Sequence, residues 1–295
     1  MRQLPTEKRA LILEMLIEGN SMRSTSRLAK VSINTVTKLL VDAGEACAAY
    51  HDEAVRNVKV QRVECDEIWS FWYAKEKNVA KAKAAPQGAG DVWTWTALDA
   101  DSKMILSYEI GDRSAETAYD FMLDLQRRVV GHLQLTTDGH SPYLQAVESV
   151  FGGDIDYAML IKQYGAPTGQ KGHERKYSPA VCTGTKKKVI SGTPNEGKIS
   201  TSYVERQNLS MRMGMRRFTR LTNAFSKKLQ NHLHMLSLYF VHYNFVRIHK
   251  TLKMTPAMAV GVSENLRDME WIVGLIDSRA SAPNRPATYK KSVSK

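Results

Sequence analysis

The chain has 295 residues, and its 43% hydrophobic and 24% charged residues are ordinary for a folded protein, which excludes fibrous and low-complexity classes. Its 42 Lys and Arg residues exceed its 30 Asp and Glu residues, so the net charge of +12 indicates either a polyanionic partner or a generally basic protein. Its three cysteines form no Cys-x-x-Cys pair, and we expect no signal peptide, zinc finger, secreted disulfide framework or membrane span, but a protein of the reducing cytosol.

The first 46 residues predict a small helical unit. Apolar residues mark a first helix that ends at Gly19 and a short second helix over 22–29. Ser32 is a suitable N-cap for a third helix, which we expect to end at Gly44. Residues 47–60 then serve as a connecting helix or linker.

The third helix has the pattern of a DNA-recognition helix. Its apolar residues Ile33, Val36 and Leu40 recur at helical spacing and are expected to face inward. The side chains left to face outward are Asn34, Thr35, Thr37 and Lys38. Two short helices, a tight turn and such a third helix predict a helix-turn-helix domain that binds DNA, although any three-helix bundle shares the pattern.

From residue 61 to residue 262 the pattern is that of one larger domain of strands and helices. Three stretches rich in β-branched and aromatic residues come first, over 60–73, 92–98 and 104–110, and the last two form a hairpin. A helix capped by Ser114, a strand ending at Asp138, a helix from Ser141 and a strand over 155–161 follow. The first three strands pair antiparallel and the later ones join in parallel. We therefore predict an α/β (α+β) fold of the ribonuclease H-like kind, with a mixed five-stranded sheet flanked by helices.

After residue 165 the sequence predicts a polar insertion, three helices and a basic tail. Residues 165–200 contain seven basic residues against two Glu, and we interpret them as a basic insertion that contacts DNA through Lys186, Lys187 and Lys188, with a solvated loop as the alternative. Helices are expected over 201–216 and 223–249, and a carboxy-terminal helix over 263–279. Residues 280–295 form a basic tail that we expect to be disordered.

Three acidic residues are the candidates for chemistry. Asp66 lies in a strand whose apolar neighbours rarely tolerate a carboxylate unless it is paired or metal-bound. Asp138 ends a strand, where ligands gather in open α/β sheets, and Glu205 begins a helix. Brought together by a fold, three carboxylates can hold two divalent cations that act on a phosphodiester.

Each of these residues also has an ordinary explanation. Asp138 before Gly139 is a common turn sequence, and a helix glutamate such as Glu205 commonly faces solvent. Glu67 competes with Asp66 as the first metal ligand, because the two adjacent side chains point to opposite faces of the strand.

Several polar and basic residues from Glu205 onward are candidates for contact with DNA. Asn208 and Arg212 share the face of Glu205 on the helix expected over 201–216, and Arg216 belongs to the basic stretch after Glu205. Arg247 and His249 lie at the end of the next helix. A solvated charged face, or the carbonyl groups of a helix end, would explain the same residues. They are Asn208, Arg212, Arg216, Arg247 and His249.

Four segments, each present once, follow one another along the chain. They are Cys65-Asp66-Glu67-Ile68-Trp69-Ser70-Phe71, Thr137-Asp138-Gly139-His140, Ser202-Tyr203-Val204-Glu205-Arg206-Gln207-Asn208, and a tail with Tyr243-Asn244, Arg247, His249 and Thr255-Pro256. Together they resemble a DDE transposase of the insertion-sequence 1 type, over residues 60 to 260. The resemblance implies that Asp66, Asp138 and Glu205 are the catalytic, metal-binding triad, and it makes Arg212 a candidate for the basic residue that often follows the glutamate.

The resemblance also implies cofactors and partners. It implies two Mg²⁺ or Mn²⁺ ions, double-stranded DNA as element ends and target, and a homo-oligomer assembled on that DNA, with no small-molecule substrate. It implies a prokaryotic protein of the cytoplasm, associated with the nucleoid. The chain departs from the family pattern in one respect, because it has no cysteine-rich zinc finger near its amino terminus.

Two rival functions explain part of the sequence. A non-catalytic DNA-binding regulator would use the helix-turn-helix and leave the acidic residues without a role. A ribonuclease H-like nuclease or resolvase would use the acidic residues, but the helix-turn-helix and the basic insertion favour a recombinase.

Overall fold

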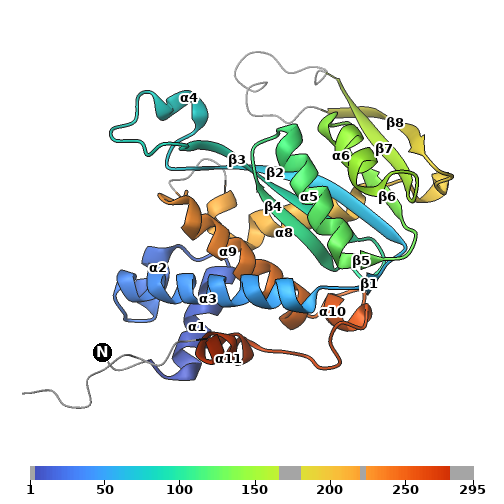
Figure 1. Ribbon diagram of the computed structural model, residues 1–295. Coiled ribbons are helices and arrows are strands. Elements are labelled where there is room, and N and C mark those ends of the chain that lie inside the picture. Colours follow the sequence, from blue (N-terminus) through green and yellow to red (C-terminus); the bar gives the residue numbers. More distant parts are fainter. Residues whose placement is uncertain (1–3, 166–180, 220–223, 280–295) are drawn as a thin grey trace, which may run out of the picture.

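The computed structural model describes residues 4–165, 181–219 and 224–279, in which an amino-terminal helical unit packs against a mixed α/β body (Figure 1). The unit consists of α1 (Thr6–Ile17), α2 (Met22–Leu28) and α3 (Ile33–Ala54). Ser32 Oγ accepts a hydrogen bond from the backbone N–H of Asn34 at 3.2 Å, so Ser32 caps α3 as predicted. The predicted tail over 280–295 lies outside the described residues.

Helix α3 does not end at Gly44 as the sequence predicts, but continues to Ala54 and takes in much of the predicted linker. Gly44 serves a different purpose, because a Cβ placed there would lie 2.3 Å from the Cβ of His234 in α9 (Leu229–Val241). Glycine therefore permits the close approach of two helices. The inward orientation predicted for Ile33 is also wrong: its side chain is 40% exposed, because it lines an open pocket described below.

We expect Gly44→Ala to lower the free energy of unfolding by about 2 kcal/mol or more, since the added methyl group forces α3 and α9 apart. A urea denaturation midpoint measures the effect. Gly274→Ala is the matched control, because Gly274 lies in α11 (Met269–Arg279) with nothing within 4 Å of an added Cβ, and a helical alanine there should stabilise by up to about 1 kcal/mol. Equal midpoints for the two variants would contradict this role for Gly44.

The body is built on one six-stranded sheet with the order β4-β3-β2-β6-β7-β8. Its strands are β2 (Arg62–Trp72), β3 (Gly90–Asp99), β4 (Ile105–Gly111), β6 (Gln134–Thr137), β7 (Asp156–Gly165) and β8 (Val181–Ser191). Strands β2, β3 and β4 pair antiparallel, whereas β6 and β7 run parallel to β2. A separate parallel pair joins β1 (Val58–Lys59) to β5 (Val129–Val130). The predicted ribonuclease H-like arrangement is confirmed by this strand order.

The sheet has six strands rather than the predicted five. The additional strand β8 lies in the segment predicted as a basic insertion, of which residues 166–180 are outside the described part of the chain. It pairs antiparallel with β7 and places Lys186, Lys187 and Lys188 opposite Ile161, Leu160 and Met159. All three lysines are exposed, which suits an edge strand, where Lys discourages pairing with a further strand.

Helices cover both faces of the sheet. Helices α5 (Ala115–Arg128) and α6 (Pro142–Phe151) lie over one face, as the green ribbons of Figure 1 show, and α8 (Ser202–Gly214) contacts β2 from the other. Instead of the single helix predicted over 223–249, α9 ends at Val241 and a π-helical turn follows. Within the described ranges the other α-helices are α4 (Glu76–Val79), α10 (Pro256–Ala259) and α11.

The helical unit and the carboxy-terminal helices share one hydrophobic core. Helix α3 packs along α9, and α1 packs against α11. Tyr50 of α3 meets Trp271 of α11 edge to face, with ring centroids 4.9 Å apart. Arg9 of α1 donates two hydrogen bonds of 2.7 Å to the carboxylate of Asp277. Helix α11, at the end of the described chain, is therefore bound to the amino-terminal helices α1 and α3.

A buried histidine, His51, and a half-buried one, His242, make this core sensitive to acid. Burial lowers the pKa of His51 to about 4 and that of His242 to about 4, with Arg128 and Arg247 respectively adding to the effect. In the unfolded chain both take up protons near pH 6.5, so stability is present above pH 6.5 and is lost as pH falls from 6.5 toward 4. For one histidine as buried as His51, the free energy of unfolding at pH 5 is lower by about 2 kcal/mol than at neutral pH. We expect the urea midpoint to fall between pH 7 and pH 5, and less steeply in His51→Gln; the same slope in both proteins would contradict this.

Candidate active site

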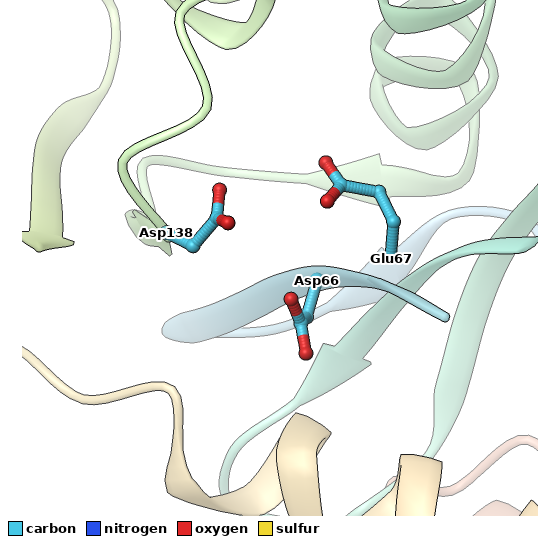
Figure 2. Close-up of side chains that lie close together, drawn as sticks. All are labelled: Asp66, Glu67 and Asp138. Atoms are coloured by element: carbon cyan, nitrogen blue, oxygen red, sulfur yellow. The ribbon is translucent and has the colours of Figure 1, made fainter. Parts of the chain in front are cut away.

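Strand β2 presents two adjacent acidic residues to opposite faces of the sheet. Asp66 points toward α8, on the side where Glu64 also lies, and Glu67 points toward α6 (Figure 2). Asp66 is half-buried and Glu67 is buried, with 8% of its surface exposed. Adjacent residues of a strand point to opposite faces, so a pocket on one face of the sheet is lined directly by Asp66 or by Glu67, but not by both.

Asp138 lies beside this pair because it directly follows β6, which runs parallel to β2. Its Oδ1 accepts a hydrogen bond from the backbone N–H of His140 at 2.9 Å, which fixes the turn. One carboxylate oxygen from each of Asp66, Glu67 and Asp138 lies within 4.8 Å of the others. Three side chains from two neighbouring strands are thus close enough to share a cation.

Glu205 lies in the first turn of α8 and lines the same pocket of about 600 Å³ as Asp66 and Asp138. Its carboxylate forms an ion pair with Lys162 of β7 and accepts a hydrogen bond from the hydroxyl of Thr201. The structure therefore brings the three sequence-predicted carboxylates to one pocket. Among the described residues, however, the tight cluster of three contains Glu67 rather than Glu205.

The electrostatics of the pocket favour a bound cation. Burial, and then the charges of Asp138 and Glu205, raise the pKa of Asp66 to about 7. Burial, and then Asp138 and Asp66, raise the pKa of Glu67 to about 8, against the opposing effect of Arg113. Crowded carboxylates of this kind repel each other unless a cation lies between them, and an all-oxygen donor set suits Mg²⁺ or Mn²⁺.

Three neighbouring residues position these carboxylates. Asn208 and Arg113 contact them directly, and Glu64 holds the helix that carries Glu205; the sequence predicted no role for Glu64 or Arg113. The Asn208 amide donates a 2.7 Å hydrogen bond to Asp66 Oδ2, and Asn208 is buried, so it does not lie on an exposed DNA-facing surface as the sequence suggested. Arg113 donates to Glu67 Oε2 at 3.2 Å and lies 4.0 Å from Asp138 Oδ2. Glu64 Oε2 accepts the backbone N–H groups of Tyr203 and Val204, which anchors the first turn of α8 on β2. The only sequence signal for Glu64 was a second carboxylate on the inner face of this strand.

We expect Glu64→Ala to lower the free energy of unfolding by about 2 kcal/mol, because it leaves the backbone N–H groups of Tyr203 and Val204, in the first turn of α8, without an acceptor. Glu64→Gln keeps an oxygen acceptor and should lose less than half as much. Urea midpoints of the two variants measure the difference. Equal losses would show that Glu64 acts through its charge and not through the two hydrogen bonds.

No protein-family model and no curated protein matches the chain. Solved structures do match it in part. A Mos1 transposase paired-end complex with left transposon end is 13% identical with a TM-score of 0.23, and the match spans 53% of this chain but only 60% of that one. A piggyBac transposase synaptic complex with hairpin DNA is 7% identical with a TM-score of 0.40, over 96% of this chain and 74% of that one.

The structure places the other predicted DNA-binding residues on several surfaces. Asn34 and Lys38 are exposed on α3, whereas Thr35 and Thr37 are half-buried, and Lys38 forms an ion pair with Asp42 at 2.6 Å. Further along the chain, Arg216 and Arg247 are exposed, and Arg212 and His249 are half-buried. No helix within the described ranges is long and apolar enough to cross a membrane.

A second pocket, of about 750 Å³, joins the helical unit to the basic segment after α8. The helical unit contributes Arg23, Ile33 and Thr37, and the basic segment contributes Arg216 and Lys227. Two regions that the sequence singled out separately for DNA binding therefore line one open, cationic hollow.

Proposed function

We propose that this chain is a DDE-type DNA transposase, similar to those of insertion-sequence 1 type, that cleaves at element ends and joins the freed 3′-hydroxyl to target DNA. The observation that carries the proposal is the meeting of Asp66, Asp138 and Glu205 in one pocket, although they are far apart in the sequence. They come from β2, the end of β6 and α8 of a ribonuclease H-like sheet. The +12 charge of the chain favours a polyanionic substrate.

Asp66, Asp138 and Glu205 would hold two Mg²⁺ or Mn²⁺ ions. When bound, such ions activate the attacking water or 3′-hydroxyl and stabilise the leaving oxygen. The protein supplies the position of each carboxylate: Asn208 holds Asp66, the turn at His140 holds Asp138, and Lys162 holds Glu205. Hydrogen bonds and ion pairs of this kind fix ligands before the substrate binds.

DNA would be held outside the pocket by the exposed cations. The helical unit, as the DNA-binding domain over residues 1–46, and the segment around Arg216 are supported in this role by their common pocket. The exposed lysines of β8 flank the strand β7, which carries Lys162 beside Glu205. Assembly of two or more copies on the element ends, in the cytoplasm of a prokaryote, completes the proposal.

A cleavage and joining assay tests it. Labelled duplexes taken from the DNA on either side of the coding sequence are incubated with the protein and Mg²⁺ or Mn²⁺, and pre-cleaved ends with a free 3′-hydroxyl are offered together with a target plasmid. We expect nicking and strand joining, both abolished by a chelator. DNA binding without cleavage would favour the non-catalytic regulator, and cleavage without joining would favour a nuclease or resolvase.

A further inference from the structure

Four aromatic side chains form a continuous strip that begins beside the carboxylates. We define the aromatic strip as Trp69, Phe71, Trp93 and Phe225. Trp69 and Trp93 are direct partners across β2 and β3, and Phe71 follows Trp69 on the same face of β2. Ring centroids are 5.7 Å apart between Trp69 and Phe71 and 5.3 Å apart between Phe71 and Phe225. Phe71 is therefore in ring contact with Trp69 and with Phe225, and strand pairing places Trp93 beside Trp69.

The strip is not part of the closed core. Trp95, two residues from Trp93 on the same face, is fully buried against Phe121 and Tyr143. All four residues of the strip are only half-buried. Large aromatic rings that remain partly open to solvent retain surface for a further contact.

Two basic side chains lie over rings of the strip. Lys75 Nζ lies 5.5 Å from the ring centroid of Trp69 and 5.7 Å from that of Phe71. The guanidinium carbon of Arg113 lies 4.7 Å from the ring centroid of Trp93. Aromatic rings interleaved with basic side chains are the combination that binds single-stranded nucleic acid, in which bases stack on rings and phosphates meet cations.

Arg113 also connects the strip to the carboxylates. The same guanidinium that lies over Trp93 donates to Glu67 at 3.2 Å and lies 4.0 Å from Asp138. Phe225, at the far end of the strip, also lines the 750 Å³ cationic pocket. The strip thus connects the carboxylate pocket, through Arg113, with the 750 Å³ cationic pocket, through Phe225.

We propose that the aromatic strip stacks unpaired bases of a DNA strand beside the carboxylate pocket. The proposal rests on the proposed function, since it extends the DNA path of that site. A paired duplex has its base faces covered by neighbouring bases, so the strip is selective for a strand that has left the duplex. Lys75 then neutralises phosphates of that strand.

A binding experiment in chelator, without catalysis, tests the strip. The full-length protein is titrated with a fluorescent 12-nucleotide single strand and with a duplex of the same sequence. We expect Trp69→Ala combined with Trp93→Ala to weaken single-strand binding roughly 10- to 100-fold and to leave duplex binding within about twofold. Tyr119→Ala removes an exposed aromatic ring on α5 that is not one of the four residues of the strip, and is the matched control.

A second readout keeps the test independent of folding. A single strand carrying 2-aminopurine should lose fluorescence on binding, and the conservative variant Trp69→Phe should retain most of that quenching. Unchanged single-strand affinity, an equal loss for duplex, or quenching that is the same in the alanine variant would each overturn the proposal. If quenching depends on the strip but metal-dependent cleavage fails, only the transposase proposal is contradicted. If cleavage occurs without strip-dependent quenching, only the proposed role of the strip is contradicted.

Discussion

Asp66→Asn is expected to reduce DNA cleavage and joining by on the order of 10³-fold or more, because it removes a negatively charged ligand from the lining of the pocket and keeps the shape of the side chain. Asn208 can still hydrogen-bond the remaining oxygen of the side chain, so the fold around α8 should persist. DNA binding should change by less than about threefold, since the cationic surfaces lie outside the pocket. Strand-transfer rates and DNA affinity, measured on the same preparation, check both parts.

A stability measurement supports the same assignment without relying on activity. In metal-free buffer Asp66→Asn should melt at a higher temperature than the wild type, because it relieves repulsion from Asp138 and Glu205. Added Mg²⁺ or Mn²⁺ should raise the melting temperature of the wild type and not that of the variant. Asp154→Asn, at a side chain that is 91% exposed, is the control and should behave like the wild type in every assay. Cleavage retained by Asp66→Asn would refute the metal-binding role.

Local patterns in the sequence were sufficient for the elements that surround the site. The hairpin of β3 and β4, the cap of α5 at Ser114 and the helix from Pro142 are all present, because each depends on nearby residues. The strand order followed from chain connectivity, since β6 and β7 reach their neighbours only through helical crossovers. The convergence of Asp66 and Asp138 follows from that order.

Features that depend on long-range contacts were not predictable from local pattern. Strand β8 carries three consecutive lysines, which resemble a loop until it is known that β7 has a free edge. Gly44 resembles a helix end, and only its contact with His234 of α9 reveals a close crossing of helices. Likewise, nothing near Asn208 in the sequence indicates that its amide is directed at Asp66.

The choice between Glu205 and Glu67 as third carboxylate depends on the same long-range geometry. Glu205 lines the pocket with Asp66 and Asp138, whereas Glu67 lies on the opposite face of β2 and is neutralised by Arg113. Glu67 nevertheless has an oxygen within 4.8 Å of the other two carboxylates. Distance alone therefore favours Glu67, and access from the pocket favours Glu205.

We expect Glu205→Gln to reduce cleavage about 10²- to 10³-fold and Glu67→Gln to reduce it less than about 10-fold. Glutamine at 205 keeps an oxygen for the hydroxyl of Thr201 but removes the charge that a cation and Lys162 share. Glutamine at 67 should change little, because burial raises the pKa of Glu67 to about 8, so that its carboxyl is largely neutral at pH 7, and Arg113 faces the charge that remains. Single-turnover cleavage over a Mn²⁺ titration compares the two. If Glu67→Gln were the more damaging change, the ions would bind on the α6 side of β2, and the carboxylate of α8 would serve only to hold Lys162.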